Sequence, residues 1–531
     1  MQVLPSGVKT AILRPTMKAC FVLQGHYAKI GHAMAKYLKE THGVSDFCAY
    51  IFSPGAHEFI KTQRDIAYNP ILVDHLLHEN YQAEVIDRNF LERYEQTYGP
   101  PYPWQYLYCD RKLMMSIGPK EETTAMIDPL YDHDTLIRTF QARARAIERM
   151  LIEAKPDFIV FFAMGALGHL ILYHVAKKLG IKVLALEYTR IGDLISITED
   201  YNTLTKIEET FRAFRTGNAD TPFHAEGRKI MADFKKMRTL KLQGDSIAIA
   251  QLPGQKNLLL PRQKKKSLPE RILASVLYLR TLTKNYLKNR RLYTYGETDM
   301  NPLRFIWYRL KQRYRLWRGC ADLYDKVDLK NNADFVFFPL HYEPELAILL
   351  LSPFYFNQIE LIRYVARSLP LQYKLYVKEH PAMYSKRARS YYKELKKIPN
   401  VVLVDTHIKS FDLIAKAKLI ATITGSAGWE AVLLGKPVIT FGSVFYNALS
   451  FVTRLRDIET LPRVIREKLT NFTSDQKELD HFVAACLKES IDFDFCGLWY
   501  ENDFNKLYSE KGMRSFCDKL MAEVKKPNPK F

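Results

Sequence analysis

Short apolar runs alternate with amphipathic segments between residues 334 and 442, and no other feature limits the fold of this chain as strongly. The apolar runs have the length of buried strands, and the amphipathic segments have helical spacing. Parallel strands need a crossover, usually a helix, so this rhythm predicts a parallel sheet with helices on its faces. The expected strands cover 334–340, 373–378, 400–405, 419–424 and 437–442, and the expected helices cover 357–369, 387–398, 410–418 and 429–435.

The first half of the chain repeats the same rhythm. Strands are expected at 19–25, 46–53, 157–164 and 181–188, and helices at 33–43, 134–155 and 168–180. A chain of 531 residues also exceeds one ordinary hydrophobic core. We therefore predict an α/β protein with two Rossmann-like parallel-sheet domains. The predicted boundaries are 1–250 for the first domain, 251–330 for a basic helical connector, 331–475 for the second domain and 476–531 for a helical tail.

Two loops of the second domain follow expected strands, at the sheet edge where ligands of parallel sheets bind. The first, "VKEHP", carries Lys378 and His380, and Pro381 restricts its direction. The second, "TGSAGWEA", opens a helix with Gly425 and Ser426, and free N–H groups at a helix start bind anions. The pair predicts a nucleotide site. The alternative for the second loop alone is an ordinary glycine turn.

These stretches also resemble a known family. The segments "FFPLHYEPE", "YFNQIELI", "YVKEHP" and "TITGSAGWEAVLLGKPVITFG" with the following "FY" are similar to the capsule polysaccharide biosynthesis family, the group related to bacterial Kdo transferases; "ALEYTRIGDLISITEDY" in the first half is similar as well. The resemblance implies a GT-B-like architecture and a nucleotide-sugar donor held mainly by the C-terminal domain. By position, His380 and Lys378 would meet the donor phosphate, Ser426 and Gly428 would line it, and Glu430 would bind ribose or base.

The catalytic base is expected from the N-terminal, acceptor-side domain, because a carboxylate facing the acceptor can take its hydroxyl proton. Glu187 and Asp193 in "LEYTRIGD" are the candidates, and Arg190 between them could bind an acidic acceptor. The alternative is a surface loop with an Arg–carboxylate pair. His26 and His32 flank the first expected strand-to-helix loop and are further acceptor candidates.

The resemblance and the loops together predict a glycosyltransferase that moves a sugar, such as a Kdo-like sugar, from a CMP- or UDP-linked donor to a glycan or lipid-linked glycan. His380 would be catalytic through a charge-assisted contact to phosphate. The sequence has no D-x-D motif, so neither an essential metal nor a separate cofactor is expected. In "LHYEPE" this chain departs from the glutamine-rich strand end of many relatives, which leaves the donor open. The alternatives are a nucleotide-sugar epimerase and a non-catalytic component of polysaccharide assembly and export.

The positive charge is concentrated in one stretch. Of the formal net charge of +20, residues Lys256–Arg318 supply +14, with 17 Lys or Arg against three acids. Interleaved Tyr and Trp suit a membrane interface, so we expect contact with an anionic membrane; a solvated connector is the alternative. No RNA-binding motif accompanies the charge, so no nucleic-acid partner is expected. With neither a signal-peptide pattern nor an apolar span, and with scattered cysteines, the protein is expected in the cytoplasm, peripheral on the inner membrane face.

Overall fold

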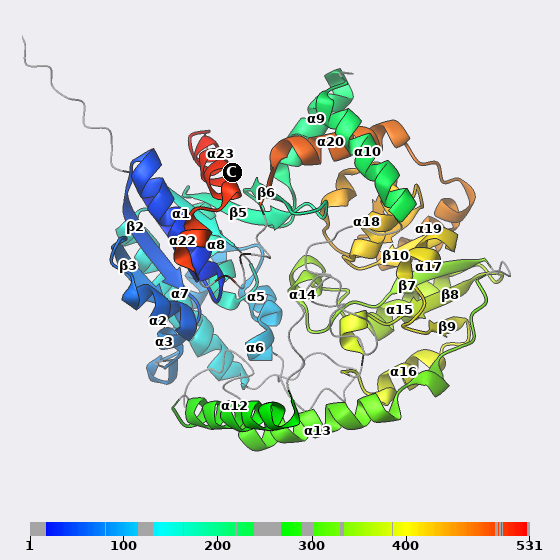
Figure 1. Ribbon diagram of the computed structural model, residues 1–531, viewed down its shortest axis with the longest axis horizontal. Helices are drawn as coiled ribbons and strands as arrows, with labels where there is room; N and C mark the ends of the chain where they lie inside the picture. Colours follow the sequence, from blue (N-terminus) through cyan, green and yellow to red (C-terminus); the bar gives the residue numbers. More distant parts are fainter. Residues whose placement is uncertain are drawn as a thin grey trace, which may run out of the picture.

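The protein forms two α/β units, each built on one sheet (Figure 1). The computed structural model describes residues 17–79, 81–114, 131–162, 164–217, 220–237, 267–288, 301–329, 334–384, 386–493, 498, 501 and 503–527. Within these residues, the prediction of two parallel-dominated α/β sheets is confirmed.

The N-terminal unit has a seven-stranded sheet in the order β13-β6-β5-β4-β1-β2-β3. Strands β1 to β5 pair in parallel, whereas β6 is antiparallel to β5 and β13 is antiparallel to β6. Alternate residues of β1 enter two different cores, Cys20 and Val22 on one face and Phe21 and Leu23 on the other. Burial on both faces explains why its sequence is an unbroken apolar run. The strands are β1 (Met17–Leu23), β2 (Val44–Ile51), β3 (Tyr68–Val73), β4 (Phe158–Phe161), β5 (Lys182–Tyr188), β6 (Leu194–Thr198) and β13 (Ser490–Asp492), and the helices are α1 (Tyr27–His42), α2 (Pro54–Thr62), α3 (Asp74–Glu79), α4 (Arg88–Tyr98), α5 (Pro103–Cys109), α6 (Arg111–Met114), α7 (His133–Ala154) and α8 (Leu167–Lys178).

The C-terminal unit has a six-stranded sheet in the order β12-β11-β10-β7-β8-β9, and all its pairs are parallel. The strands and helices expected between residues 334 and 442 are present. The strands are β7 (Phe335–Pro339), β8 (Lys374–Lys378), β9 (Val401–Val404), β10 (Leu419–Thr422), β11 (Val438–Thr440) and β12 (Val452–Arg454), and the helices are α14 (Leu346–Leu351), α15 (Gln358–Ser368), α16 (Arg389–Lys396), α17 (Ser410–Lys416), α18 (Ser426–Leu433), α19 (Leu461–Thr470) and α20 (Gln476–Glu489).

Two predicted domain boundaries differ from the packing of the chain. Helices α9 (Thr205–Gly217) and α10 (Pro222–Met237), expected in the first domain, pack on α20, and Phe211 and Phe234 share one core with Trp429. The expected tail does not stand apart either. Its β13 joins the N-terminal sheet, and α22 (Phe504–Tyr508) and α23 (Lys511–Val524) pack on α1. The chain therefore crosses between the units more than once.

The loop expected at 26–32 is a second correction. Helix α1 begins at Tyr27, and it ends before Gly43 as expected, where φ is +71°. Gly31, within the expected loop, is inside the helix. A Cβ there would lie 2.7 Å from a carbon of Leu23 and 2.9 Å from a carbon of Phe162. Glycine is present because α1 approaches the sheet closely, and not because the chain turns.

The connector contains helices, as predicted. Helices α12 (Leu268–Lys288) and α13 (Pro302–Arg318) pack side by side along the lower edge of the molecule, below both units (Figure 1). The remainder of the predicted membrane segment Lys256–Arg318, including Lys264–Lys266, Arg290 and Arg291, lies outside the described residues. Neither α12 nor any other described helix has the combination of length and apolar character needed to span a bilayer.

Candidate functional site

A cavity of about 90 Å³ lies between the two units, where the β5–β6 hairpin faces the start of α18. The carboxyl ends of β5 and β10 both point toward it, as expected for the ligand side of parallel sheets. It therefore brings together residues far apart in sequence. Its lining consists of Glu187, Tyr188, Arg190 and residues 201–204 from the N-terminal part of the chain, and of Ala347, Leu351, residues 424–426, Trp429 and residues 443–446 from the C-terminal part.

Glu187 is the carboxylate that this cavity contains. It lies near the end of β5, where its backbone pairs with Ser196 of β6. Burial raises the pKa of Glu187 from an ordinary 4.5 to about 7, although the positive charge of Arg190 opposes the shift. A carboxylate with a pKa near neutrality can accept a proton at physiological pH, which is the property required of a general base.

Arg190 lies at the hairpin tip in a left-handed conformation, with φ at +59°. Non-glycine residues rarely adopt this region, and its strain is typical of functional turns. The Arg190 charge acts on groups of the other unit, because it opposes the burial-raised pKa values of Glu345 and Tyr446. It is the cation that the N-terminal unit presents to the cavity.

The start of α18 supplies backbone donors on the opposite wall. Gly425 precedes the helix and Ser426 is its first residue, as predicted, and both line the cavity. A Cβ on Gly425 would lie 2.7 Å from Thr422 Oγ1 and 3.2 Å from His341 Nε2, so the close approach requires glycine. Two buried cavity atoms, Thr424 Oγ1 and Trp429 Nε1, have no hydrogen-bond partner among the described residues. Unpartnered donors beside a helix N-terminus suit an anionic or strongly polar ligand.

Gly428 is placed differently from the prediction. It is buried, and it is not among the described residues that line the cavity. A Cβ there would lie 2.3 Å from the hydroxyl oxygen of Tyr446, which itself donates to the Gly425 carbonyl over 2.8 Å. Gly428 thus permits Tyr446 to hold the loop before α18.

We expect Gly428→Ala to lower the free energy of unfolding by about 1–3 kcal/mol, because the methyl group overpacks this contact. Tyr446→Phe removes the clashing hydroxyl, so the double variant Gly428→Ala/Tyr446→Phe should recover part of the loss in urea denaturation. If the free energy of unfolding lost by the double variant equalled the sum of the losses in the two single variants, this account would be contradicted.

His341 supports the cavity wall through Thr424 without being among the described residues that line the cavity, and it was not among the predicted site residues. It follows β7, and its Nε2 accepts a hydrogen bond from the Thr424 N–H over 3.1 Å. Burial lowers the pKa of His341 to about 3, so the ring is neutral. Its Nδ1 has no hydrogen-bond partner among the described residues. Its position directly after a strand was the available sequence signal.

A buried ionic cluster supports the loop after β7, which carries His341, and the loop after β8, which carries His380; we call these the histidine loops. The cation of this cluster, Arg387, was not among the predicted site residues. The Arg387 guanidinium pairs with Glu379 at 2.5 Å and with Glu343 at 2.8 Å, and it donates to the His341 carbonyl over 2.7 Å. Tyr392 donates to Glu379 over 2.8 Å. Nothing in the local sequence distinguishes Arg387 from the other basic residues around it. The cluster fixes the carboxyl ends of β7 and β8 relative to each other.

The predicted phosphate ligands of the first loop have other surroundings. Lys378 is buried and donates to Ser410 Oγ over 3.1 Å, and burial lowers its pKa to about 8. The Glu430 charge acts on Lys378, and neither residue is among the described residues that line the cavity. Burial and neighbouring cations, Arg387 first among them, lower the pKa of His380 to about 4. This pKa favours a neutral His380 ring at pH 7, and the charge-assisted contact to phosphate stays a prediction.

The remaining acceptor-side candidates are not among the described residues that line the cavity. His32 is buried in α1, 2.8 Å from Asp65 and 3.1 Å from the hydroxyl of Tyr68, so it is not a loop residue. His26 is exposed immediately before α1. Asp193, near the hairpin tip, is not among the described residues that line the cavity. Of the predicted acceptor-side residues, the cavity contains Glu187 and Arg190.

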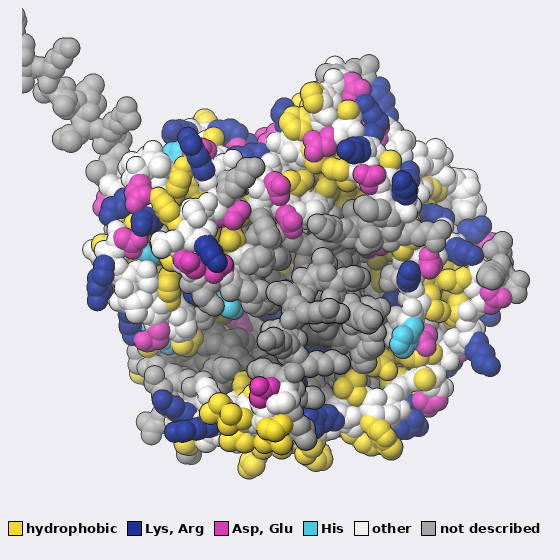
Figure 2. All heavy atoms as spheres, in the orientation of Figure 1, with side chains coloured by type: hydrophobic (Ala, Val, Ile, Leu, Met, Phe, Trp, Pro, Cys, Tyr) yellow, Lys and Arg dark blue, Asp and Glu magenta, His cyan; other side chains and the backbone are white. Residues whose placement is uncertain are grey.

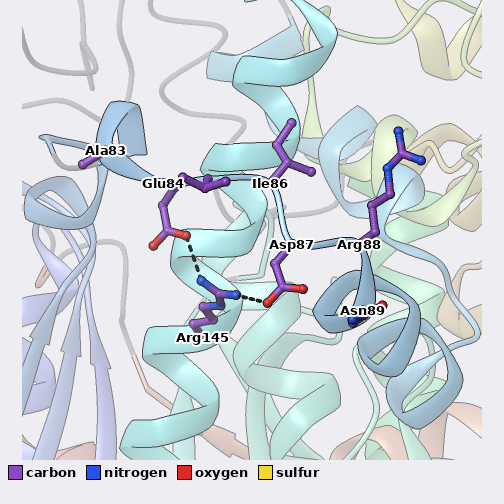
Figure 3. A pocket seen from close by; sticks show the side chains of 8 residues that line it. Ala83, Glu84, Ile86, Asp87, Arg88, Asn89 and Arg145 are labelled. Carbon is purple, nitrogen blue, oxygen red and sulfur yellow. Dashed lines mark hydrogen bonds and ion pairs between the residues drawn. The ribbon is translucent and has the colours of Figure 1, made fainter.

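A second, larger hollow of about 640 Å³ lies on the N-terminal unit between the start of α4 and α7 (Figure 3). Figure 3 shows Arg145 between two carboxylates, with Arg88 pointing away from them. Arg145 pairs with Glu84 at 3.2 Å and with Asp87 at 2.5 Å. These charges are satisfied within the protein, so the hollow is a weaker candidate than the cavity between the units.

Comparison with known proteins confirms the family resemblance for part of the chain. Residues 250–466 match the family model described as capsule polysaccharide biosynthesis protein. Protein FixF of Sinorhizobium fredii (strain NBRC 101917 / NGR234) is 32% identical over 130 residues, which are 24% of this chain. The chain spans about a third (31%) of the length of that relative.

Two solved structures show low similarity. The beta Kdo 2,7 transferase of Thermosulfurimonas dismutans KpsC has 15% identity and a TM-score of 0.34, covering 72% of this chain and 90% of that one. UDP-GlcNAc 2-epimerase from Neisseria meningitidis bound to UDP-GlcNAc has 12% identity and a TM-score of 0.25, covering 89% and 99%. The residues matched by the family model include the α18 wall of the cavity, whereas Glu187 and Arg190 lie outside them.

Proposed function

We propose that this protein is a glycosyltransferase of surface polysaccharide assembly, because residues 250–466 match the capsule polysaccharide biosynthesis family. It moves a sugar from a nucleotide-sugar donor to a glycan or lipid-linked glycan acceptor. One observation carries the proposal: a single cavity between two α/β units combines a helix N-terminus with a carboxylate whose pKa is about 7. Two such units facing one cavity also support a GT-B-like assignment.

The donor is held by the C-terminal wall. The nucleotide phosphate lies against the start of α18, where backbone N–H groups and Ser426 donate to it. Thr424 and Trp429 supply the additional unpartnered donors. These groups stabilise the charge that develops on the leaving phosphate, the role that preorganised dipoles have in catalysis. The proposed step requires no metal.

The acceptor enters from the N-terminal wall. Glu187 takes the proton of the acceptor hydroxyl, whose oxygen forms a bond to the anomeric carbon while the bond from that carbon to the phosphate oxygen breaks. The nucleotide leaves with the bonding electrons. Arg190 binds a carboxylate of the acceptor or of the transferred sugar, which favours acidic sugars of the Kdo type.

Nucleotide release tests this function directly. The purified chain is incubated with CMP- and UDP-linked sugars, with and without glycan acceptors, and a donor that binds the folded state should raise the melting temperature. Release that depends on acceptor supports transfer. Isomerisation of the donor without acceptor would instead identify an epimerase, and neither binding nor release would identify a non-catalytic assembly component.

We expect His380→Ala to reduce transfer about 10- to 100-fold while the melting temperature changes little. The neutral His380 ring lies beside His341, which accepts a hydrogen bond from the Thr424 backbone N–H. A neutral donor to phosphate contributes less binding free energy than a charged one. His380→Gln keeps a donor and should retain more activity than His380→Ala. Wild-type turnover in a folded His380→Ala protein would show that this residue takes no part in transfer.

A further inference from the structure

The outer face of the connector exposes more apolar surface than a soluble helix pair should. Large apolar side chains follow one another at helical spacing along α13, so they form a stripe on one face, and α12 continues it. Trp317 is 80% exposed, Leu303 76% and Trp307 60%. We name this surface the apolar stripe. It consists of Ile272, Leu273, Val276, Leu277 and Leu287 on α12, and of Leu303, Ile306, Trp307, Leu310, Tyr314 and Trp317 on α13.

The two helices pack on each other, and the C-terminal unit holds the end of α13. Leu282 of α12 is buried, and Tyr278 of α12 packs on Phe305 of α13 with ring centroids 5.3 Å apart. Just beyond α13, Arg389 of the C-terminal unit donates to the Gly319 carbonyl over 2.7 Å. These contacts attach α13, and with it the apolar stripe, to the C-terminal unit. Figure 2 shows hydrophobic side chains gathered along this lower edge, with Lys and Arg among them.

Basic residues flank the apolar stripe. Helix α12 carries four Lys or Arg and one acid, and α13 carries six Lys or Arg and no acid. Arg309, Arg313 and Arg318 of α13 are exposed. Apolar stripes with Trp and Tyr, bordered by Lys and Arg, are typical of helices that lie in a membrane interface. A dimer interface would place these cations against an identical set of cations, which is unfavourable for a second copy of the chain.

We infer that α12 and α13 form a platform that inserts the apolar stripe among the headgroups of an anionic lipid bilayer. The sequence alone predicted attraction by charge, which salt would abolish. The exposed stripe adds burial of apolar surface, which salt does not weaken. The inference is independent of the proposed function, because neither the stripe nor its flanking cations line the cavity.

Flotation of the full chain with vesicles tests the platform. One set of vesicles is phosphatidylcholine alone, and a second contains about 30% phosphatidylglycerol. We expect binding to the anionic vesicles, weakened but not abolished by high salt. Each cation near an anionic leaflet raises the vesicle-binding constant about fivefold. Arg309→Glu/Arg313→Glu should therefore lower that constant at least tenfold. Failure of the wild-type protein to bind anionic vesicles would overturn the inference.

Matched variants separate insertion from general stickiness. Leu303→Ser/Trp317→Ser removes two exposed side chains of the stripe, and we expect at least a tenfold loss of vesicle binding with an unchanged melting temperature. Val85→Ser/Leu371→Ser removes two comparably exposed side chains elsewhere, 81% and 105% exposed, and should bind as the wild type does. Equal binding by the stripe variant and the control variant would overturn the inference.

Tryptophan emission distinguishes a bilayer from a protein partner. Insertion should shift the emission of Trp307 and Trp317 to shorter wavelength, and brominated lipids should quench it; Trp307→Phe/Trp317→Phe should lose both effects. Size-exclusion chromatography provides the second arm. A dimer in the wild type that becomes a monomer in Leu303→Ser/Trp317→Ser would show that a second copy of the chain covers the stripe. That result would overturn the inference of a bilayer.

Discussion

Glu187→Gln should reduce transfer by about 10²–10⁴-fold while donor binding stays close to that of the wild type. Glutamine keeps the size and hydrogen-bonding capacity of the side chain but cannot accept the acceptor proton, and loss of a positioned base has an effect of this size. The donor contacts arise from the other wall of the cavity. Single-turnover rates, with donor affinity from thermal shift, measure the two effects separately.

The pH dependence of the wild type provides an independent readout of the same group. Because burial raises the pKa of Glu187 to about 7, kcat/KM should rise as the pH passes through about 7, when the carboxylate becomes charged. The same shift affects stability with a definite sign. Between about pH 4.5 and 7 the folded protein binds a proton that the unfolded chain releases, so this contribution to stability is lost as the pH rises. This pH dependence of stability should be absent in Glu187→Gln.

Asp193→Asn is the matched control, because Asp193 belongs to the same hairpin but is not among the described residues that line the cavity. We expect it to retain most activity and the rise in rate near pH 7. If Asp193→Asn abolished transfer and Glu187→Gln did not, the base would be Asp193. The cavity lined by Glu187 would then not be the acceptor site.

Arg387→Ala should lower the free energy of unfolding by about 3–5 kcal/mol. The change leaves the buried Glu379 and the partly buried Glu343 without their cation, and an unpaired buried charge is far more costly than the loss of a surface pair. It also removes the donor to the His341 carbonyl, so transfer should fall in the folded fraction. Urea denaturation followed by circular dichroism measures the first effect.

Arg363→Ala is the comparison for this variant. Arg363 pairs with Glu360 at 2.9 Å on the surface of the same unit, and such exposed pairs contribute at most about 1 kcal/mol. If Arg387→Ala cost no more than Arg363→Ala, the buried cluster would not stabilise the histidine loops. Arg387→Lys should be only a partial rescue, since a lysine cannot reproduce the forked contacts.

The sequence by itself determined most elements of the C-terminal unit, although α14, β12 and α19 were not predicted. The strands and helices between residues 334 and 442 follow from local patterns, because apolar runs, helical spacing and the glycines or prolines that end them act within a few residues. The position of Gly425 and Ser426 at a helix start was predicted for the same reason, and the family model match covers these residues. In the N-terminal unit, the parallel strands β1, β2, β4 and β5 were also predicted.

Only the tertiary structure decided which residues meet. Glu187 acquires a pKa near 7 because it is desolvated where the β5–β6 hairpin and the C-terminal unit line one cavity, and a hairpin sequence carries no information about that desolvation. Arg387 becomes the centre of a buried cluster through carboxylates that lie 8 and 44 residues away. The loop expected at 26–32 lies almost entirely in helix α1, and the chain after residue 476 returns to the first sheet. Contacts between distant segments set solvation and electrostatics, whereas sequence patterns report the local backbone.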